Sequence, residues 1–309
     1  MKAMLLKAIH DLRRERNPLE PVEMSEPGPG EGEILIHVRA CGVCHTELDE
    51  IEGRTPPPVF PIIPGHEVVG RVAERGAGAS QHEIGARVGV GWFFSSCGRC
   101  SFCREGKENL CADFRATGRD AHGGYAEYMV VPETSAFPVP EGLSDAEAAP
   151  LFCAGAIGYR SLMLAGIRDG DSLGLTGFGA SAHLVLKMTR ALYPASPVFV
   201  FARSGKEQEF ARELGAVWAG DTGDESPERL RAIIDTTPAW KPVVEAMRNL
   251  EPNGRLVINA IRKEENDKRC LLDIDYPTHL WLEKEIKSVA NVAPRDIAEC
   301  LRLAADIPL

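Results

Sequence analysis

Ser172-Leu-Gly-Leu-Thr-Gly-Phe-Gly-Ala-Ser-Ala182 is a short apolar run followed by a glycine-rich turn and the start of a helical pattern. Gly177 permits a tight turn, and Gly179 allows backbone N–H groups to approach a pyrophosphate. Ala182 is small enough for the following helix to pack closely on the strand. A glycine turn in an ordinary α/β domain is the alternative. The strand before the turn and the helix after it favour a dinucleotide-binding site.

The rest of the second half repeats this alternation of apolar strand and helix. One helix is expected from about Ser181 and another from about Lys206. Apolar runs predict further strands over residues 198–201, 232–235 and 255–260. Because strands that alternate with helices build a parallel sheet covered on both faces, we predict a doubly wound α/β domain over residues 151–290.

The first half has a different pattern, with short β-branched or alternating runs between turn residues. It predicts a β-rich domain with long loops over residues 1–150, whose strands cover residues 33–40, 67–74, 87–90 and 125–131. At the other end, residues 295–307 predict an amphipathic helix that leads to Pro308-Leu309 with no closing strand after it. We expect the chain to be truncated there.

The composition, with 44% hydrophobic and 26% charged residues among 309, excludes a disordered chain. The 35 basic and 45 acidic residues give a net charge of −10 without a long block of either sign, which argues against a nucleic-acid partner. The mixed run from Lys263 to Arg269 predicts a solvated loop.

The most apolar stretch, residues 148–167, contains Pro150 and Arg160. A membrane span needs about 20 apolar residues, so we expect no membrane partner. The N-terminus meets charged residues before a long apolar core develops, which argues against a signal peptide. We therefore expect a cytoplasmic protein, in which clustered cysteines are more often metal ligands than disulfides.

Four of the nine cysteines follow one another within fifteen residues, in the loop that contains Cys97, Cys100, Cys103 and Cys111. Four thiolates complete the tetrahedral coordination of zinc and leave no open position, which describes a structural site. The alternatives are unrelated thiols or disulfides, and an iron–sulfur cluster. The spacing matches neither ferredoxin pattern, so a structural zinc site is favoured.

A second set of metal-ligand types is dispersed along the chain as Cys44, His66 and Cys153. Two thiolates and one imidazole leave a fourth zinc position for water or substrate, which is the arrangement of a catalytic zinc site. Spacing alone is a weak indication, because a single buried cysteine or histidine is more often part of a core.

Taken together, these segments resemble the zinc-dependent alcohol dehydrogenases of the medium-chain dehydrogenase/reductase superfamily. The resemblance rests on the order and spacing of five motifs: Cys44-His-Thr, Gly65-His-Glu, the four-cysteine loop, Cys153-Ala-Gly and the glycine turn. It implies a GroES-like catalytic domain over residues 1–150 with a structural zinc lobe at about 92–112. It further implies a Rossmann domain over 151–290 and, over 291–309, the start of a segment that returns to the catalytic domain.

The resemblance also assigns roles to residues at matching positions. Cys44, His66 and Cys153 correspond to the catalytic zinc ligands, and the four clustered cysteines correspond to the structural ligands. Glu67 matches a carboxylate close to the metal, and Glu47 matches a residue that orients the ligand histidine. A solvated surface glutamate is the alternative for each.

The implied reaction is hydride transfer between a small primary or aromatic alcohol, bound to zinc as its alkoxide, and NAD(P). Thr46 matches the hydroxyl that takes the alcohol's proton. Asp49 stands where many relatives have a histidine that passes the proton to solvent; the alternative is that it is only a surface residue. Trp92 and Phe93 match residues that line the substrate pocket, and core packing is the alternative for both.

Cofactor contacts are implied for His45, Gly177, Gly179, Ala180, Arg203 and Ser204. The second strand of the α/β domain runs into Ala202-Arg-Ser, where NAD-dependent enzymes place a carboxylate on the ribose. Since Arg203 and Ser204 can contact a 2′-phosphate, we predict NADP, with NAD as the alternative.

We expect a homodimer or homotetramer, because relatives join their Rossmann sheets edge to edge and residues 255–260 resemble the strand region near that edge. Two other classes of protein are alternatives to the enzyme. One is a zinc-stabilised nucleotide-binding protein with little catalysis, and the other is a zinc-ribbon nucleic-acid binder.

Overall fold

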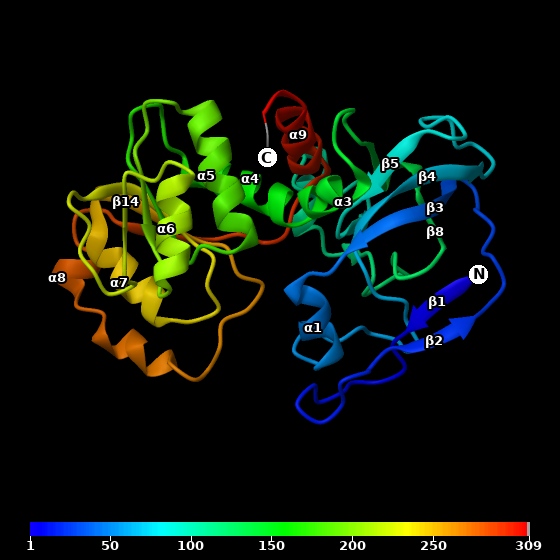
Figure 1. The fold of residues 1–309 in the computed structure, drawn as a ribbon, viewed down its shortest axis with the longest axis horizontal. Helices are drawn as coiled ribbons and strands as arrows, with labels where there is room; N and C mark the ends of the chain where they lie inside the picture. The colour runs from blue at the N-terminus through cyan, green and yellow to red at the C-terminus, as the bar shows by residue number, and fades with distance from the viewer. Residues whose placement is uncertain (308–309) are drawn as a thin grey trace. The chain divides into compact units, whose positions relative to one another are not determined.

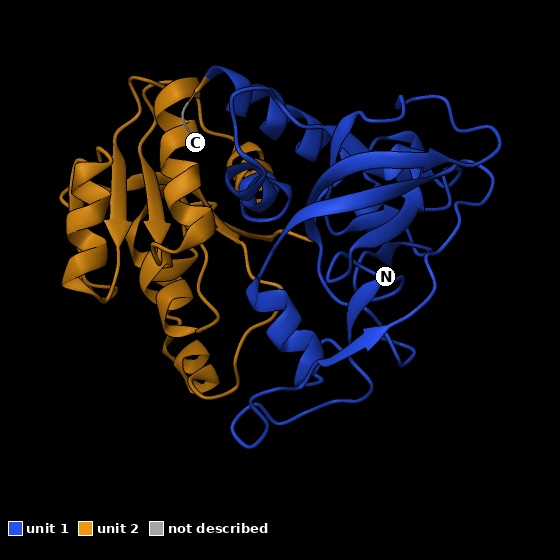
Figure 2. Ribbon diagram, turned by 45° about the vertical axis from the view of Figure 1, so that its right-hand side comes forward, with its two compact units in different colours: residues 1–156, 291–306 blue, residues 157–290, 307–309 orange. Residues whose placement is uncertain are grey.

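The computed structural model describes residues 1–307, which form two compact units. The first unit combines Met1–Ala156 with Asn291–Asp306, and the second contains Ile157–Ala290 (Figure 2). Pro308 and Leu309, at which we expected the chain to stop early, lie outside the described residues.

The first unit is built on a five-stranded antiparallel sheet with the order β8-β3-β4-β5-β9 (Figure 1). The strands are β3 (Glu33–Gly42), β4 (Glu67–Arg75), β5 (Arg87–Val90), β8 (Tyr128–Pro132) and β9 (Ala136–Pro138). A second, two-stranded sheet pairs β1 (Lys2–Leu5) with β2 (Glu20–Glu23).

The core of the first unit lies on one face of this sheet. Ile34 and Ile36 in β3, two residues apart, are both fully buried against the β-branched residues Val68 and Val72 of β4. Leu35, whose side chain points to the opposite face, is also buried, so this part of β3 is covered on both faces. The β-rich fold predicted from the sequence for this part of the chain is therefore confirmed.

Short helices and turns of the first unit carry the residues of interest. They are α1 (His45–Ile51), β6 (Phe93–Ser95), α2 (Ser101–Arg104), η1 (Glu108–Leu110), β7 (Arg115–Ala116), η2 (Glu133–Ser135), α3 (Asp145–Ala148) and η3 (Ala149–Phe152). η3 packs directly against the sheet. Its Phe152 ring lies so close to Gly89 of β5 that a Cβ at this glycine would be 2.2 Å from the ring. The helix α9 (Pro294–Asp306) also packs in this unit and buries Ile297 and Cys300.

The second unit contains a six-stranded, fully parallel sheet with the order β12-β11-β10-β13-β14-β15. Numbered along the chain within this unit, that order is 3-2-1-4-5-6, which is the Rossmann topology. Its strands are β10 (Leu173–Thr176), β11 (Val198–Phe201), β12 (Trp218–Gly220), β13 (Leu230–Asp235), β14 (Leu250–Ile258) and β15 (Glu285–Ser288). The predicted doubly wound parallel sheet is confirmed.

The helices of the second unit are α4 (Ala154–Ala165), which begins in the first unit, α5 (Ala180–Leu192), α6 (Gly205–Glu213), α7 (Lys241–Asn249), η4 (Lys268–Asp273) and α8 (Tyr276–His279). On one face of the sheet, Val243 and Met247 of α7 pack with Phe199 and Leu256.

Among residues 1–307, no single helix is long and apolar enough to cross a membrane. Residues 145–152 and α4 pass that test only as a pair, which is bent by 42°.

Candidate functional site

Three segments of the first unit converge on one cluster of ligand-type side chains. β3 ends at Gly42, which pairs with Glu67 at the start of β4, so the residues that follow Gly42 lie beside those that precede Glu67. Cys44 is the N-cap of α1, His66 directly precedes β4, and Cys153 ends η3. The ligand atoms of Cys44, His66, Glu67 and Cys153 all lie within 4.8 Å of one another.

The two cysteines of this cluster interact directly. Their Sγ atoms are 3.6 Å apart. The hydrogen bond from Cys153, together with His66, lowers the pKa of Cys44 to about 3, whereas the same hydrogen bond and burial raise the pKa of Cys153 well above its usual value. A divalent cation binds two such sulfurs as thiolates and takes the place of their protons.

Glu47 connects two members of the cluster. Its Oε2 accepts the backbone N–H of Cys44 at 2.8 Å, and its Oε1 lies 2.6 Å from Nδ1 of His66. Burial alone would lower the pKa of His66, but the charges of Glu47 and Cys44 raise it well above the usual value. With Nδ1 engaged, Nε2 is the ring nitrogen left to ligate a metal.

Glu67 packs tightly over the end of β3. A Cβ at Gly42 would lie 2.0 Å from Glu67 Oε2, so only glycine fits there without moving the carboxylate. Burial and the Cys44 thiolate raise the pKa of Glu67 to about 7. Glu47 is 1% and Glu67 5% exposed, so the alternative of solvated surface glutamates is wrong for both.

Thr46 lies at the edge of the cluster, where its Oγ1 is 3.5 Å from Cys44 Sγ. Asp49, on the same helix, is 1% exposed, so the alternative of a surface residue is wrong for Asp49 as well. Its Oδ1 accepts Arg54 Nε at 2.5 Å and lies 4.0 Å from Nε2 of His45, whose side chain is exposed.

Trp92 and Phe93 both contact the Phe114 ring, each with a ring-centroid distance of 5.8 Å. Phe93 is buried, whereas Trp92 is only partly buried and presents its edge to the His66 ring at 6.4 Å.

Sequence reasoning missed Glu50, which is 1% exposed and accepts the indole N–H of Trp92 at 3.4 Å. Burial raises its pKa to about 8. No sequence pattern marks this carboxyl, because it lies in a run of acidic residues on a short helix.

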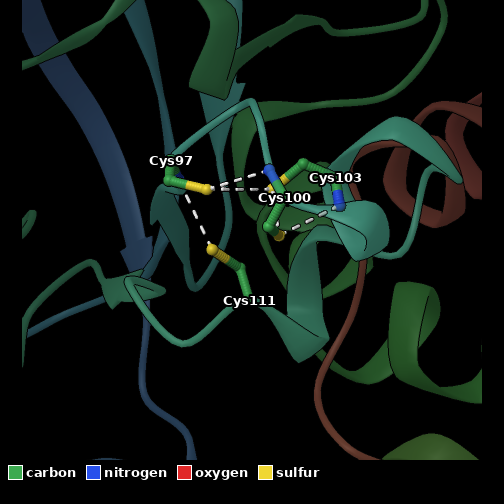
Figure 3. Close-up of side chains that lie close together, drawn as sticks. All are labelled: Cys97, Cys100, Cys103 and Cys111. Carbon is green, nitrogen blue, oxygen red and sulfur yellow. Dashed lines mark hydrogen bonds between the residues drawn. The ribbon is translucent and has the colours of Figure 1, made fainter.

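The second cluster forms where the loop between β6 and β7 folds back on itself, and its members are Cys97, Cys100, Cys103 and Cys111 (Figure 3). Their ligand atoms also lie within 4.8 Å of one another. Backbone N–H groups point at three of the sulfurs: Cys100 N lies 3.4 Å from Cys97 Sγ, Cys103 N 3.5 Å from Cys100 Sγ, and Cys97 N 3.5 Å from Cys111 Sγ.

These donors favour thiolates. Backbone N–H groups of Arg99 and Cys100 lower the pKa of Cys97 to about 6. No disulfide joins cysteines within the described part of the chain, so all four sulfurs are available to a metal. A set of four thiols held by N–H donors fits a tetrahedral zinc ion with no open position.

In the second unit, the glycine turn follows β10 as predicted. Gly177 adopts φ +77°, and a Cβ on it would lie 2.9 Å from the Thr237 side chain, so glycine is required on both counts. Gly179 is the N-cap of α5, and no atom lies within 4 Å of the place where its Cβ would be. This open N-terminus, with Ala180 exposed at its first position, can accept a pyrophosphate.

Arg203 and Ser204 are exposed just beyond the carboxyl end of β11, the strand that pairs with β10. Ser204 is the N-cap of α6, but its hydroxyl makes no capping hydrogen bond. Ala202 is 1% exposed, and its backbone N–H donates to Gly220 at 2.9 Å.

The predicted solvated loop at residues 263–269 is wrong for its first residue. Lys263 is 9% exposed at its side chain and forms an ion pair with Asp235, which is fully buried at the end of β13. A run of mixed charges gives no sign that one member turns inward.

Comparisons with known proteins agree on one family. Residues 30–141 match the model described as the alcohol dehydrogenase GroES-like domain. Over 296 residues the chain is 40% identical to the protein named probable alcohol dehydrogenase AdhA of Mycobacterium tuberculosis, which covers 94% of this chain and 84% of that protein. It is 30% identical to an alcohol dehydrogenase of Geobacillus stearothermophilus over 302 residues, or 94% of this chain and 87% of the relative.

A solved structure agrees with these sequence matches. A candidate zinc-binding dehydrogenase from Sinorhizobium meliloti, bound to NADP, has a TM-score of 0.86 and 26% identity to this chain. The match covers 100% of this chain and 90% of that one. The order of the motifs, the two folds and these matches lead to one conclusion: the chain belongs to the zinc-type alcohol dehydrogenase family of the medium-chain dehydrogenase/reductase superfamily.

Proposed function

We propose that this protein is a zinc-dependent, NADP-linked alcohol dehydrogenase or aldehyde reductase that acts on small primary or aromatic alcohols. The observation that carries the proposal is the convergence of Cys44, His66 and Cys153, with the Thr46 hydroxyl beside them. Residues 1–150, joined by Cys153, are then the catalytic domain, residues 151–290 bind the dinucleotide, and residues 291–306 return to the catalytic domain.

The catalytic zinc would be held by the sulfurs of Cys44 and Cys153 and by Nε2 of His66. When bound, zinc supplies Lewis-acid chemistry, which lowers the pKa of an alcohol at its open position. Glu47 keeps two of these ligands in place, because one of its oxygens binds the backbone of Cys44 and the other faces His66. Glu67 adds a carboxylate close to the metal.

Proton movement is assigned to α1. The Thr46 hydroxyl would accept the proton of the substrate alcohol at Oγ1 and release its own proton toward solvent. Asp49 lies one helical turn further along, where its carboxylate is held between Arg54 and His45. The route from Thr46 to solvent then passes along this helix, with exposed His45 at its outer end.

The loop that contains Cys97, Cys100, Cys103 and Cys111 would hold a second, structural zinc. Its four sulfurs leave no position for substrate, so this metal contributes to the stability of residues 92–112 rather than to the reaction.

The dinucleotide would place its pyrophosphate at the N-terminus of α5, where Gly179 leaves open space. Arg203 and Ser204 then face the adenosine ribose at the end of β11, and their side chains suit a 2′-phosphate. The similar structure from Sinorhizobium meliloti is bound to NADP. The choice of NADP over NAD rests on Arg203 and Ser204 of this chain. His45 and Ala180 complete the proposed contacts with the cofactor.

Trp92 and Phe93 are proposed to line the substrate pocket. The Trp92 ring, 6.4 Å from that of His66, is close enough to the metal site to limit the size of the alcohol. Its hydrogen bond to Glu50 fixes the orientation of the indole.

A homodimer or homotetramer is proposed to form through the edge of the parallel sheet. Residues 255–260 overlap β14, and the edge strand itself is β15, all of whose residues are exposed. An unpaired strand edge is able to continue a sheet across a two-fold axis. We expect a dimer or tetramer in sedimentation analysis, and a monomer at all concentrations would contradict this assembly.

The function is tested by following nicotinamide absorbance with NADP and with NAD against a panel of short and aromatic alcohols, before and after treatment with a zinc chelator. We expect chelator-sensitive turnover that prefers NADP. The absence of turnover with both cofactors, in folded and zinc-loaded protein, would refute the proposal.

A further inference from the structure

A buried ion pair lies at the carboxyl edge of the parallel sheet, within the second unit. Asp235 is the last residue of β13, and Lys263 follows β14 in the chain. The ammonium of Lys263 donates to Asp235 Oδ2, to the carbonyl of Thr237 at 2.8 Å and to that of Ala239 at 2.9 Å. An ammonium has three donors, so every one of them is used.

The other carboxylate oxygen of Asp235 is equally occupied. Its Oδ1 accepts the hydroxyl of Thr176 at 2.6 Å and the hydroxyl of Thr237 at 2.8 Å. Thr176 is the last residue of β10, so the network joins the ends of two neighbouring strands to the loop that follows β13.

This network supports the glycine turn directly. Gly177 follows Thr176, and Thr236 bonds twice to the Thr176 carbonyl, through its backbone N–H and its hydroxyl, both at 3.0 Å. The side chains of Thr236 and Thr237 occupy the space where a Cβ of Gly177 would be. Thr236 and Thr237, at the start of the segment 236–239, thus pack directly against the turn.

The network lies at the place in the sheet where doubly wound folds bind their ligands. In the order β12-β11-β10-β13-β14-β15, the chain moves from β10 toward one edge of the sheet and, from β13 onward, toward the other edge. The strand order therefore reverses between β10 and β13. Ligands of doubly wound sheets bind outside the carboxyl ends of the strands at this switch point. A buried ion pair is a weak device for stability alone, because apolar residues of similar volume often serve as well.

We propose that Lys263, through Asp235, is a positioning residue for the dinucleotide: it holds residues 236–239 under the glycine turn in the geometry that binds the cofactor. The proposal rests on the proposed function, which places the cofactor at this turn. Lys263 does not touch the cofactor in this account, since its three donors are already used within the protein.

The test compares three variants with the wild type. Lys263→Met removes the ammonium, and the double variant Asp235→Asn/Lys263→Met removes both charges, so that no unpaired charge is left buried. Lys268→Met is the matched control, because that lysine pairs with Glu265 on the exposed side of the same loop. The measurements are the Kd for NADP by titration, the KM and kcat, the zinc content and the melting temperature.

We expect the Kd and KM for NADP to rise at least about tenfold in both Lys263 variants, with zinc content unchanged, kcat within about threefold, and wild-type values in Lys268→Met. Rising KM at nearly constant kcat is the sign of lost binding rather than lost chemistry. Should Lys263→Met fail to fold, the double variant still decides the question.

Wild-type affinity for NADP in the double variant would overturn the proposal, because only charge compensation would then matter. Failure of the double variant to fold would also overturn it, because the pair would then support the whole unit. A wild-type protein that binds neither NADP nor NAD would instead refute the proposed function.

Discussion

At the scale of single residues, the first metal cluster depends on one carboxylate that does two tasks. Glu47 caps α1 through the Cys44 N–H and faces His66 with its other oxygen. The capping bond sets where α1 begins, and the contact with His66 sets which ring nitrogen faces the cluster. The same residue therefore determines both a local helix start and the metal geometry.

Thr46 and Asp49 lie on one helix, but we expect their substitutions to lower the kcat by different amounts. Thr46→Ala is expected to lower the kcat for alcohol oxidation by about 10²-fold or more, because a positioned proton acceptor is lost. Asp49→Asn keeps the size of the side chain, and we expect a loss of less than about tenfold. Steady-state kinetics at fixed NADP measure both variants, and an undiminished rate in Thr46→Ala would refute its role.

Arg203 carries the prediction for cofactor choice. Hydrogen bonds to charged groups contribute about 1.5–3 kcal/mol. Arg203→Ala should therefore lower the kcat/KM for NADP by roughly tenfold or more and leave the kcat/KM for NAD nearly unchanged. Lys206→Ala, on the exposed first turn of α6, is the control. Equal losses for NADP and NAD, measured as kcat/KM, would show that Arg203 does not contact the 2′-phosphate.

Some residues of the candidate site could be predicted from the sequence, and others could not. The cysteine loop and the glycine turn could be predicted from spacing, because their residues are close neighbours along the chain. Cys44, His66 and Cys153 needed the resemblance, since 109 positions separate the two cysteines whose sulfurs are 3.6 Å apart. Glu50 and Lys263 could not be found, because burial of a charged residue depends on tertiary packing that local patterns do not encode.

At the scale of elements, the pairing of β3 with β4 delivers the ligands. Gly42 opposes Glu67, which fixes the distance between the chain after β3 and the chain before β4. A shift of this register by one residue would turn the side chains of β4 to the other face. The cluster is therefore a consequence of strand register as much as of its own residues.

Gly42→Ala tests this point. The added Cβ would lie 2.9 Å from the Cβ of Glu67 as well as against its carboxylate, and Glu67 is too buried to move aside. We expect a loss of stability of about 1–3 kcal/mol, as for overpacked cores, together with one zinc lost per chain. Denaturant unfolding and metal analysis measure the two effects.

Gly28→Ala is the control, because nothing lies within 4 Å of the new Cβ. If Gly42→Ala matched this control in both stability and zinc content, the close packing of Glu67 would have no part in building the site.

Strongly apolar elements were the best predicted. The strand at residues 198–201 is found as expected, and the helix expected over residues 295–307 is α9. The edge strand β15 was missed because its sequence, Glu-Ile-Lys-Ser, is polar and all four residues are exposed. Because β15 buries neither face, it lacks the hydrophobic pattern on which such predictions depend.

At the scale of the whole molecule, the two candidate zinc sites use separate segments of the first unit and differ in what they leave open. Four sulfurs complete the coordination in the cysteine loop, whereas the Cys44 cluster offers two sulfurs and one imidazole. Loss of a ligand in one cluster should therefore leave the metal of the other in place.

The most direct measurement is the zinc content and alcohol oxidation of Cys153→Ala, with Cys300→Ala as the matched control. Cys300 is a buried cysteine of the same unit that belongs to neither cluster. We predict two zinc ions per chain and turnover in the wild type and in Cys300→Ala. Cys153→Ala should keep one zinc and NADP binding but lose turnover, whereas two zinc ions and wild-type turnover in Cys153→Ala would contradict the catalytic assignment.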